Sequence, residues 1–211
     1  MNLPDEKKNK ELKMNNANAV NFPNTHRYAF GNVNYLYDYY PANRFPDNAL
    51  PEPLRNIRKA LWDFKKGICN FFSRTLVENL VNVIAQSGQF NSERVAVLCV
   101  PASSEYKTQL RYSHLISMLK QVLPRARFIN DQIVFTGQKA QKHLQSDRNI
   151  NSCSHFYING PIPEPDILVI DDIVTRGGTF SDVVQMLDNS YGAKRYCFMT
   201  IARTVSPNIL L

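Results

Sequence analysis

The sequence comprises 211 residues, 44% of them hydrophobic and 20% charged, and it carries a formal net charge of +7. This length suits one domain with a sizeable core and is short for two, and the composition is ordinary for a soluble globular protein. The positive charge favours anionic partners, either phosphorylated metabolites or nucleic acid, although many basic proteins have no such partner.

The four cysteines are widely spaced and form no CxxC pair, which excludes a zinc ribbon and the disulfide framework of a small secreted domain. They are Cys69, Cys99, Cys153 and Cys197. The N-terminal segment lacks the apolar core of a secretory signal, and no apolar stretch approaches the roughly 20 residues that cross a bilayer. We therefore expect a cytoplasmic protein without a membrane partner.

The N-terminal residues differ in character from the rest of the chain. Residues 1–26 are rich in Asn and Lys and poor in apolar periodicity, so we expect a flexible lead there. Residues 27–211 are predicted to form a single domain. Within it we distinguish an N-terminal extension with helices over 27–90 from a core over 91–211.

The N-terminal extension contains an aromatic segment followed by two segments of helical spacing. The density of aromatic residues over 33–45 indicates an ordered segment packed on the main body. Three prolines mark 46–53 as a connection. Apolar spacing predicts helices over 54–66 and 70–86, the second through an apolar set that includes Phe71, Phe72, Leu76, Leu80, Val83 and Ile84.

In the core, apolar runs alternate with segments of helical spacing. The run Val95–Pro101 predicts a strand that is covered on both faces. After it we predict a helix over 107–123, a strand or bend over 129–135, a helix over 138–145, an edge element over 156–158, a strand over 166–171, a helix over 179–190 and a strand over 195–201. This alternation predicts an α/β fold with a mostly parallel sheet flanked by helices.

One segment carries a pattern that suits anion binding. The strand over 166–171 runs into Asp171 and Asp172, and a Thr-Arg-Gly-Gly-Thr turn then leads into a helix. Ligands of open α/β sheets bind where the strands end, which is where this turn must lie. Gly177 and Gly178 permit a tight turn of converging N–H groups, and the start of the helix adds further N–H groups and a positive dipole end.

The side chains of this segment complete the pattern. Thr175 and Thr179 can donate hydroxyl hydrogen bonds to the same anion, and the two aspartates can accept hydrogen bonds from sugar hydroxyls about one ribose length away. The alternative is that Asp172 merely ends a strand and the glycines merely make a turn. We favour the functional interpretation because the whole pattern is long and ordered.

The segment resembles the phosphoribosyl pyrophosphate signature of type I phosphoribosyltransferases. By that resemblance, Asp171 and Asp172 are the catalytic acids and bind the ribose 2′ and 3′ hydroxyls. The residues implied to cradle the 5-phosphate are Thr175, Arg176, Gly177, Gly178 and Thr179. The sequence departs from the family pattern at Arg176, where a small residue or Thr is commoner.

In this family a second loop, after an earlier parallel strand, binds the pyrophosphate. The strand over 95–101 and the loop over 102–107 are the natural candidates, with Ala102, Ser103, Ser104 and Lys107 as the implied contacts. Hydroxyl and ammonium groups suit anionic oxygens and Mg²⁺-bound water. The alternative is an ordinary polar loop between strand and helix. Arg111, one helical turn beyond Lys107, could support the same anion.

The chain also resembles the ComF-like branch, whose members are associated with competence and DNA uptake and described as amidophosphoribosyltransferase-like. The similarity covers about 95–205 and rests on Val100-Pro101, Arg148-Asn149, Phe156 and Ala202-Arg203-Thr204. Two features depart from it. ComF-like proteins often start with a cysteine-rich zinc module, and this chain has only the aromatic segment over 33–45. The chain also has Arg111-Tyr-Ser-His where the family has Arg-Gly-Phe-Asn.

The resemblance implies an enzyme that uses Mg²⁺ and displaces pyrophosphate from ribose C1 of phosphoribosyl pyrophosphate with a nitrogen nucleophile. Segments 28–45 and 200–211 would select that acceptor, and neither contains a motif that identifies it. Two alternatives remain open. One is a non-catalytic phosphoribosyl-binding regulator or DNA-uptake accessory, and the other, ranked last, is a protein that binds nucleic acid alone. A homodimer is compatible with each.

Overall fold

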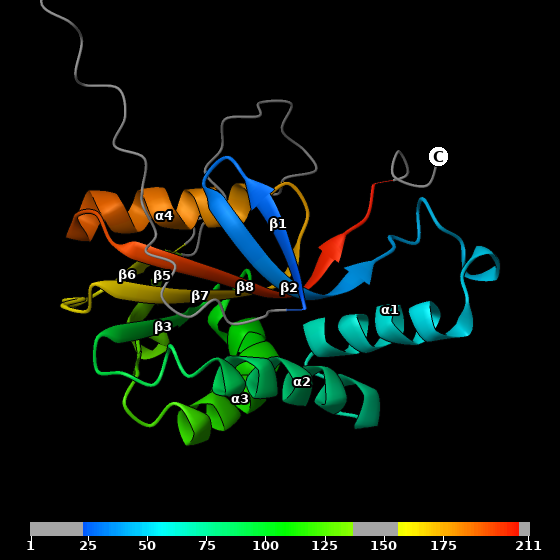
Figure 1. Ribbon diagram of the computed structural model, residues 1–211, viewed down its shortest axis with the longest axis horizontal. Helices are drawn as coiled ribbons and strands as arrows, with labels where there is room; N and C mark the ends of the chain where they lie inside the picture. The colour runs from blue at the N-terminus through cyan, green and yellow to red at the C-terminus, as the bar shows by residue number, and fades with distance from the viewer. Residues whose placement is uncertain (1–22, 137–155, 207–211) are drawn as a thin grey trace, which may run out of the picture.

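The computed structural model describes residues 23–136 and 156–206, and a central sheet lies between two layers of helices (Figure 1). The elements are β1 (Asn24–Tyr28), β2 (Gly31–Tyr39), α1 (Glu52–Lys65), α2 (Phe71–Ser87), β3 (Val95–Cys99), α3 (Glu105–Val122), β4 (Arg127–Phe128), β5 (Ile133–Phe135), β6 (Phe156–Ile158), β7 (Asp166–Val174), α4 (Gly178–Tyr191) and β8 (Arg195–Thr204). The predicted helix over 138–145, the pair Arg148-Asn149 and most of the predicted lead lie outside the described residues.

The main sheet has the strand order β1-β2-β8-β7-β3-β4. Only β1 runs antiparallel to its neighbour, and the other four pairings are parallel. Helices α1, α2 and α3 cover one face and α4 covers the other (Figure 1). The prediction of an α/β fold with a mostly parallel sheet flanked by helices is therefore confirmed. Strands β5 and β6 form a separate antiparallel pair.

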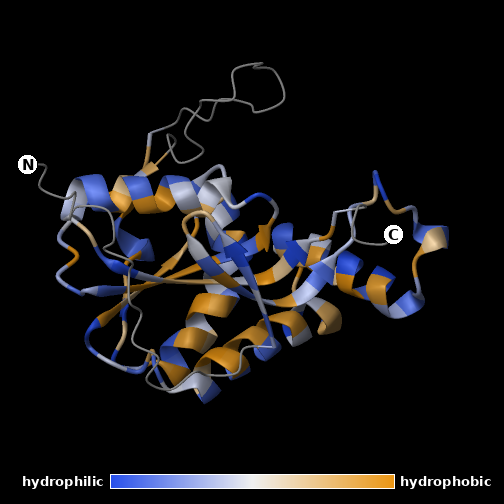
Figure 2. Cartoon of the chain, turned by 45° about the horizontal axis from the view of Figure 1, so that its top comes forward, coloured by the Kyte–Doolittle hydropathy of each residue, from blue (hydrophilic) through white to orange (hydrophobic). Residues whose placement is uncertain are grey.

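The central strand β7 explains why the apolar runs predicted the sheet. Its residues alternate between two cores: Leu168 and Ile170 pack with the α1–α3 layer, and Ile167 and Val169 pack on the α4 side. All four side chains are at most 1% exposed. Because both faces are covered along this stretch, all four of these positions are apolar. Figure 2 shows hydrophobic residues along the sheet and on the inner sides of the helices.

The aromatic segment predicted to pack on the main body contributes a strand to the main sheet. β2 pairs in parallel with β8, and Val33 and Tyr35 are buried. β1 joins it as the edge strand of a hairpin and includes the last residues of the predicted lead. The sheet is thereby wider by two strands than the core over 91–211 alone would make it.

The junction of α1 and α2 corrects one detail of the predicted pattern. Phe71 and Phe72 were counted with the apolar face of the second helix, but their side chains are 77% and 50% exposed. The helix begins at Phe71, behind a capping box in which Asn70 and Ser73 each accept the other's backbone N–H. The first turn extends past the layer below it, so helical spacing overestimated burial there.

Candidate functional site

The parallel strands end together at the right of Figure 1, and the predicted acid pair lies near that end of β7. The strand was expected to stop at Asp171 but continues to Val174. It does so because β8 continues to pair with it, Asp171 opposite Thr200 and Val174 opposite Arg203. The two carboxylates are therefore attached to backbone that sheet hydrogen bonds hold in place.

Asp172 is a buried carboxylate held by two cations. Its side chain is 5% exposed; Arg111 Nη1, from α3, lies 2.6 Å from Oδ2, and Lys65 Nζ, at the end of α1, lies 3.4 Å from Oδ1. The N–H of Ile173 donates to the same Oδ1 at 2.6 Å. Such pairing offsets the large cost of burying a charge.

Asp171 has a different environment although it is the adjacent residue. Its Oδ1 accepts the N–H of Asp172 at 2.8 Å and the hydroxyl of Tyr112 at 3.4 Å. Burial and the neighbouring Asp172 charge raise the pKa of Asp171 to about 7. No Lys or Arg among the described residues forms an ion pair with Asp171. The two adjacent acids therefore differ in their partners: Asp172 is paired with two cations and Asp171 with a hydroxyl and a backbone N–H.

The turn after β7 leads into α4 as the sequence predicted, one residue earlier than expected. Gly177 has φ = 76°, and a Cβ at this position would lie 2.4 Å from Phe30 Cε1, so both the conformation and the space require glycine. The N-cap residue, Gly177, has no side chain that could cap α4, and the first bond of the helix joins Ser181 N–H to Gly177 O at 3.0 Å. This helix start presents backbone N–H groups in a geometry that suits an oxyanion.

The remaining residues of the predicted phosphate loop surround that helix start. Thr175 and Arg176 are exposed, and Thr179 is half-buried in the first turn of α4. The hydroxyl of Thr175 lies 3.0 Å from that of Thr204. Gly178 has open space around it. The loop is therefore accessible to a ligand along most of its length.

The predicted pyrophosphate loop is shorter than expected because α3 begins at Glu105. Ser104 caps this helix, accepting the N–H of Lys107 at 3.4 Å. Ala102 N–H donates to Thr108 Oγ1 at 2.9 Å. Lys107 consequently lies in the first helical turn, where it is exposed. The hydroxyl of Ser103 and the ammonium of Lys107 are the better placed of the predicted contacts.

The β1–β2 hairpin lies beside the phosphate loop. Tyr28 donates its hydroxyl to the carbonyl of Thr175 at 3.5 Å, and Phe30 packs on Gly177. Arg203, at the end of β8, lies 2.7 Å from His26 Nδ1 and 5.1 Å from the centre of the Tyr35 ring. Parts of both segments predicted to select the acceptor are thus close to the loop. Segment 207–211 lies outside the described residues.

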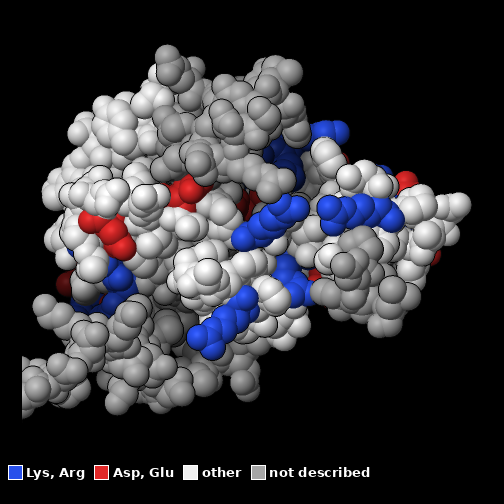
Figure 3. Space-filling model, turned by 90° about the horizontal axis from the view of Figure 1, so that it is seen from above, with Lys and Arg blue, Asp and Glu red and all other residues white. Residues whose placement is uncertain are grey.

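Two members of the acid cluster, Lys65 and Tyr112, carry no signal in the sequence. They come from α1 and α3, and their patterns are those of ordinary helices. Arg111 was predicted to support the pyrophosphate, and in the structure it pairs with Asp172. Seen from the side of α4, Lys and Arg side chains gather over the half of the surface where the parallel strands end (Figure 3). That end of the molecule is suited to anions.

These features define an α/β protein with a buried acid pair followed by a tight glycine turn and the start of a helix. No protein-family model and no curated protein matches the chain. Within the described residues, no cluster of three or more His, Cys, Asp or Glu side chains is arranged to hold a metal ion. Over the same residues, none of the helices is long and apolar enough to cross a membrane.

Proposed function

We propose that this protein binds phosphoribosyl pyrophosphate and transfers its phosphoribosyl group to a nitrogen nucleophile. The observation that carries the proposal is the adjacency of the buried pair Asp171–Asp172 and the glycine-capped start of α4 behind Gly177. Carboxylates accept hydrogen bonds from ribose hydroxyls, and a helix start binds a phosphate. The two groups follow each other along one chain segment, as the two ends of a ribose 5-phosphate require.

The acid pair would also favour the reaction. As the bond from C1 to pyrophosphate breaks, positive charge develops on the ribose ring and negative charge on the leaving group. The Asp172 carboxylate, held in place by its ion pairs with Arg111 and Lys65, would lie preorganised near the ring. The mechanism requires no covalent nucleophile, because the acceptor nitrogen attacks C1 while the pyrophosphate leaves with the bonding electrons.

The surrounding cations support the leaving group in this proposal. Lys65 and Arg111 lie on the α1–α3 side of the pair, and Lys107 is exposed at the start of α3. When ribose hydroxyls share the oxygens of Asp172, part of the positive charge of these side chains becomes available to the pyrophosphate. Positive charge placed where anionic charge grows lowers the barrier to its departure.

The residues also suit Mg²⁺ as a companion of the substrate. Mg²⁺ is commonly held by one or two carboxylates together with waters and substrate phosphates. Asp171, a buried carboxyl without an ion-pair partner among the described residues, is the group that would take this position. The metal would supply positive charge to the leaving pyrophosphate.

Calorimetric titration with phosphoribosyl pyrophosphate, with and without Mg²⁺, tests the site. We expect Asp171→Asn to weaken Mg²⁺-dependent binding by tenfold or more, because it removes the carboxylate that would hold the metal and keeps the shape. Asp131→Asn is the matched control, since this side chain is 83% exposed and pairs with Lys120 on the surface. Absence of binding to the wild type at millimolar ligand would refute the proposal.

Turnover requires a separate assay. The wild type would be incubated with phosphoribosyl pyrophosphate, Mg²⁺ and a set of nitrogenous bases and amines, and pyrophosphate release would be followed. Release that depends on one acceptor identifies the reaction. Binding without release under every condition would favour the non-catalytic regulator, because the site would then retain its ligand without chemistry.

A further inference from the structure

The large hydrophobic side chains that remain exposed are gathered at one corner of the molecule. Among the described residues seven such side chains are exposed, and six of them come from the facing ends of α1, α2 and α3 and the α1–α2 loop. We call this set the apolar corner: Trp62, Ile68, Phe71, Phe72, Tyr106 and Leu110. The seventh, Tyr157, lies on β6. Such clustering marks an interaction surface, whereas scattered exposure does not.

The apolar corner is held in a fixed shape by the loop between α1 and α2. Asn70 Nδ2 donates to Asp63 Oδ2 at 2.7 Å, and Ser73 Oγ donates to the carbonyl of Ile68 at 2.7 Å. A Cβ on Gly67 would lie 2.7 Å from the Cβ of Leu110, so the loop backbone packs directly on α3. The exposed side chains are therefore presented by rigid structure.

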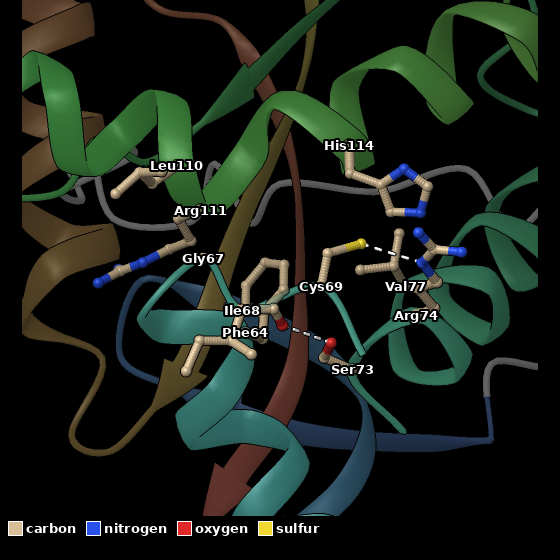
Figure 4. A pocket seen from close by; sticks show the side chains of 10 residues that line it. All are labelled: Phe64, Gly67, Ile68, Cys69, Ser73, Arg74, Val77, Leu110, Arg111 and His114. Carbon is tan, nitrogen blue, oxygen red and sulfur yellow. Dashed lines mark hydrogen bonds between the residues drawn. The ribbon is translucent and has the colours of Figure 1, made fainter. Parts of the chain in front are cut away.

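A shallow pocket joins the loop to α3 and makes the surface continuous. Figure 4 shows Ile68 and Leu110 at this pocket, together with Arg74 from α2 and His114 from α3. The rings of Phe71 and Phe72 pack edge to face, with centres 5.6 Å apart. The corner is thus one surface, built by three helices and the loop that connects two of them.

Basic side chains border the apolar corner. Lys66, Arg74 and Lys107 are exposed there, and Lys66 Nζ lies 5.9 Å from the centre of the Trp62 ring. Two exposed acids lie there as well, Glu105 at the start of α3 and Glu78 one helical turn beyond Arg74. The local balance is positive, as is the charge of the whole chain. A partner with many negative charges and an apolar interior is complementary to this surface.

We propose that the apolar corner docks on the surface of a lipid bilayer that contains anionic lipids. Exposed aromatic and aliphatic side chains beside Lys and Arg are the combination that binds the boundary between headgroups and acyl chains. A second copy of this chain is disfavoured because it would oppose like charges. Single-stranded nucleic acid is disfavoured because Ile68 and Leu110 cannot stack on bases.

A sequence without a bilayer-spanning segment can still bind at a bilayer surface. Surface binding requires only exposed side chains, and the helical spacing had assigned Phe71 and Phe72 to the buried face. The apolar corner adjoins the phosphoribosyl site, because the end of α1 and the start of α3 contribute to both, but its exposed side chains do not include the acid pair. The proposal can be tested in the absence of any phosphorylated ligand.

Co-sedimentation with vesicles tests the proposal. The full chain would be mixed with vesicles of phosphatidylcholine alone, or of phosphatidylcholine and phosphatidylglycerol in equal parts. We expect binding to the anionic vesicles to exceed binding to the neutral vesicles and to fall with added salt. The variant Phe71→Ser with Phe72→Ser should lose at least about tenfold in partition coefficient. The control Tyr157→Ser, an equally polar change at an exposed ring, should bind as the wild type does.

The charged border is tested in the same assay. Replacing Lys66 and Arg74 by Gln should lower binding to anionic vesicles about 25-fold, since each basic residue contributes roughly fivefold near such a surface. Replacing Arg94 and Arg125, exposed near the opposite ends of the strands, makes the same change in net charge. If the apolar corner is the contact, this control variant should lose several-fold less binding than the variant at Lys66 and Arg74.

Three other outcomes would each overturn the proposal. No sedimentation of the wild type with anionic vesicles removes it directly. If light scattering shows a dimer, and the change at Phe71 and Phe72 dissociates it, the apolar corner is a self-association surface. A single-stranded oligonucleotide that binds more tightly than the vesicles, and loses affinity with the same change, assigns it to nucleic acid. Thermal unfolding of the variants excludes misfolding, because both phenylalanines are exposed.

Discussion

Replacing Arg111 by Met breaks the shorter of the two ion pairs of Asp172 while keeping most of the side-chain volume. The carboxylate is 5% exposed, and the guanidinium lies 2.6 Å from it. Removing one partner of a buried pair costs about 3–5 kcal/mol, because the other charge remains buried. Lys65, still 3.4 Å away, offsets part of this loss. We therefore expect a decrease of about 3 kcal/mol in the free energy of unfolding, the lower end of that range.

Urea unfolding measures this loss. With a slope of roughly 2 kcal/mol per molar urea, the midpoint should fall by about 1.5 M. Lys120→Met is the control: its ammonium lies 3.9 Å from Asp131, and both side chains are at least half exposed. Surface pairs of this kind contribute at most about 1 kcal/mol. Equal shifts for the two variants would refute the reasoning that Asp172 depends on Arg111.

The double variant Arg111→Met with Asp172→Asn separates the pair from other effects of Arg111. Removing both charges leaves no buried ion unpaired, so the double variant should be more stable than the sum of the two single changes predicts. A purely additive result would show that Arg111 stabilises the fold through its contacts with Tyr112, whose ring centre lies 5.7 Å from the guanidinium carbon.

Two further predictions concern the acid pair and the phosphate loop. Because the pKa of Asp171 is raised to about 7, the folded state binds the extra proton between about pH 4 and pH 7, and stability falls as the pH rises through this window. Asp171→Asn should flatten that decline, measured by urea unfolding at several pH values, and an unchanged slope would contradict the assignment. Gly177→Ala should cost about 1–3 kcal/mol, because φ is 76° and Phe30 occupies the space of the new Cβ, whereas Gly178→Ala meets nothing and should cost less than 1 kcal/mol. Equal unfolding temperatures for the two alanine variants would contradict the reasoning.

The parts of the fold that could be predicted are those in which local pattern and burial coincide. β3 and β7 were predicted within a few residues because strands covered on both faces are continuously apolar. β2 was not predicted as a strand. Its nine residues mix buried and exposed positions, and it joins the sheet through β8, which is distant in the sequence. No local pattern encodes such a pairing.

In the candidate site, too, only the residues that belong to one local sequence pattern could be predicted. Asp171, Asp172 and Gly177 are close in the sequence, so one motif predicted their proximity. Lys65 and Tyr112 reach the acid pair from two other helices, and a basic residue at the end of a helix is too common to indicate such a contact. The sequence therefore predicted the groups that would hold a ligand and missed those that set their charge.

The charge state of the acid pair connects stability to the proposed function. A buried carboxylate with two cations is a weak source of stability, since apolar side chains of similar volume often serve a core as well or better. A second buried acid beside it, with its pKa raised to about 7, adds a cost at and above neutral pH. A fold gains nothing from this arrangement, and the covered end of β7 could have been apolar like the rest of the strand. Ligand hydroxyls and a cation would offset both costs, which is the physical reason to expect a bound sugar phosphate here.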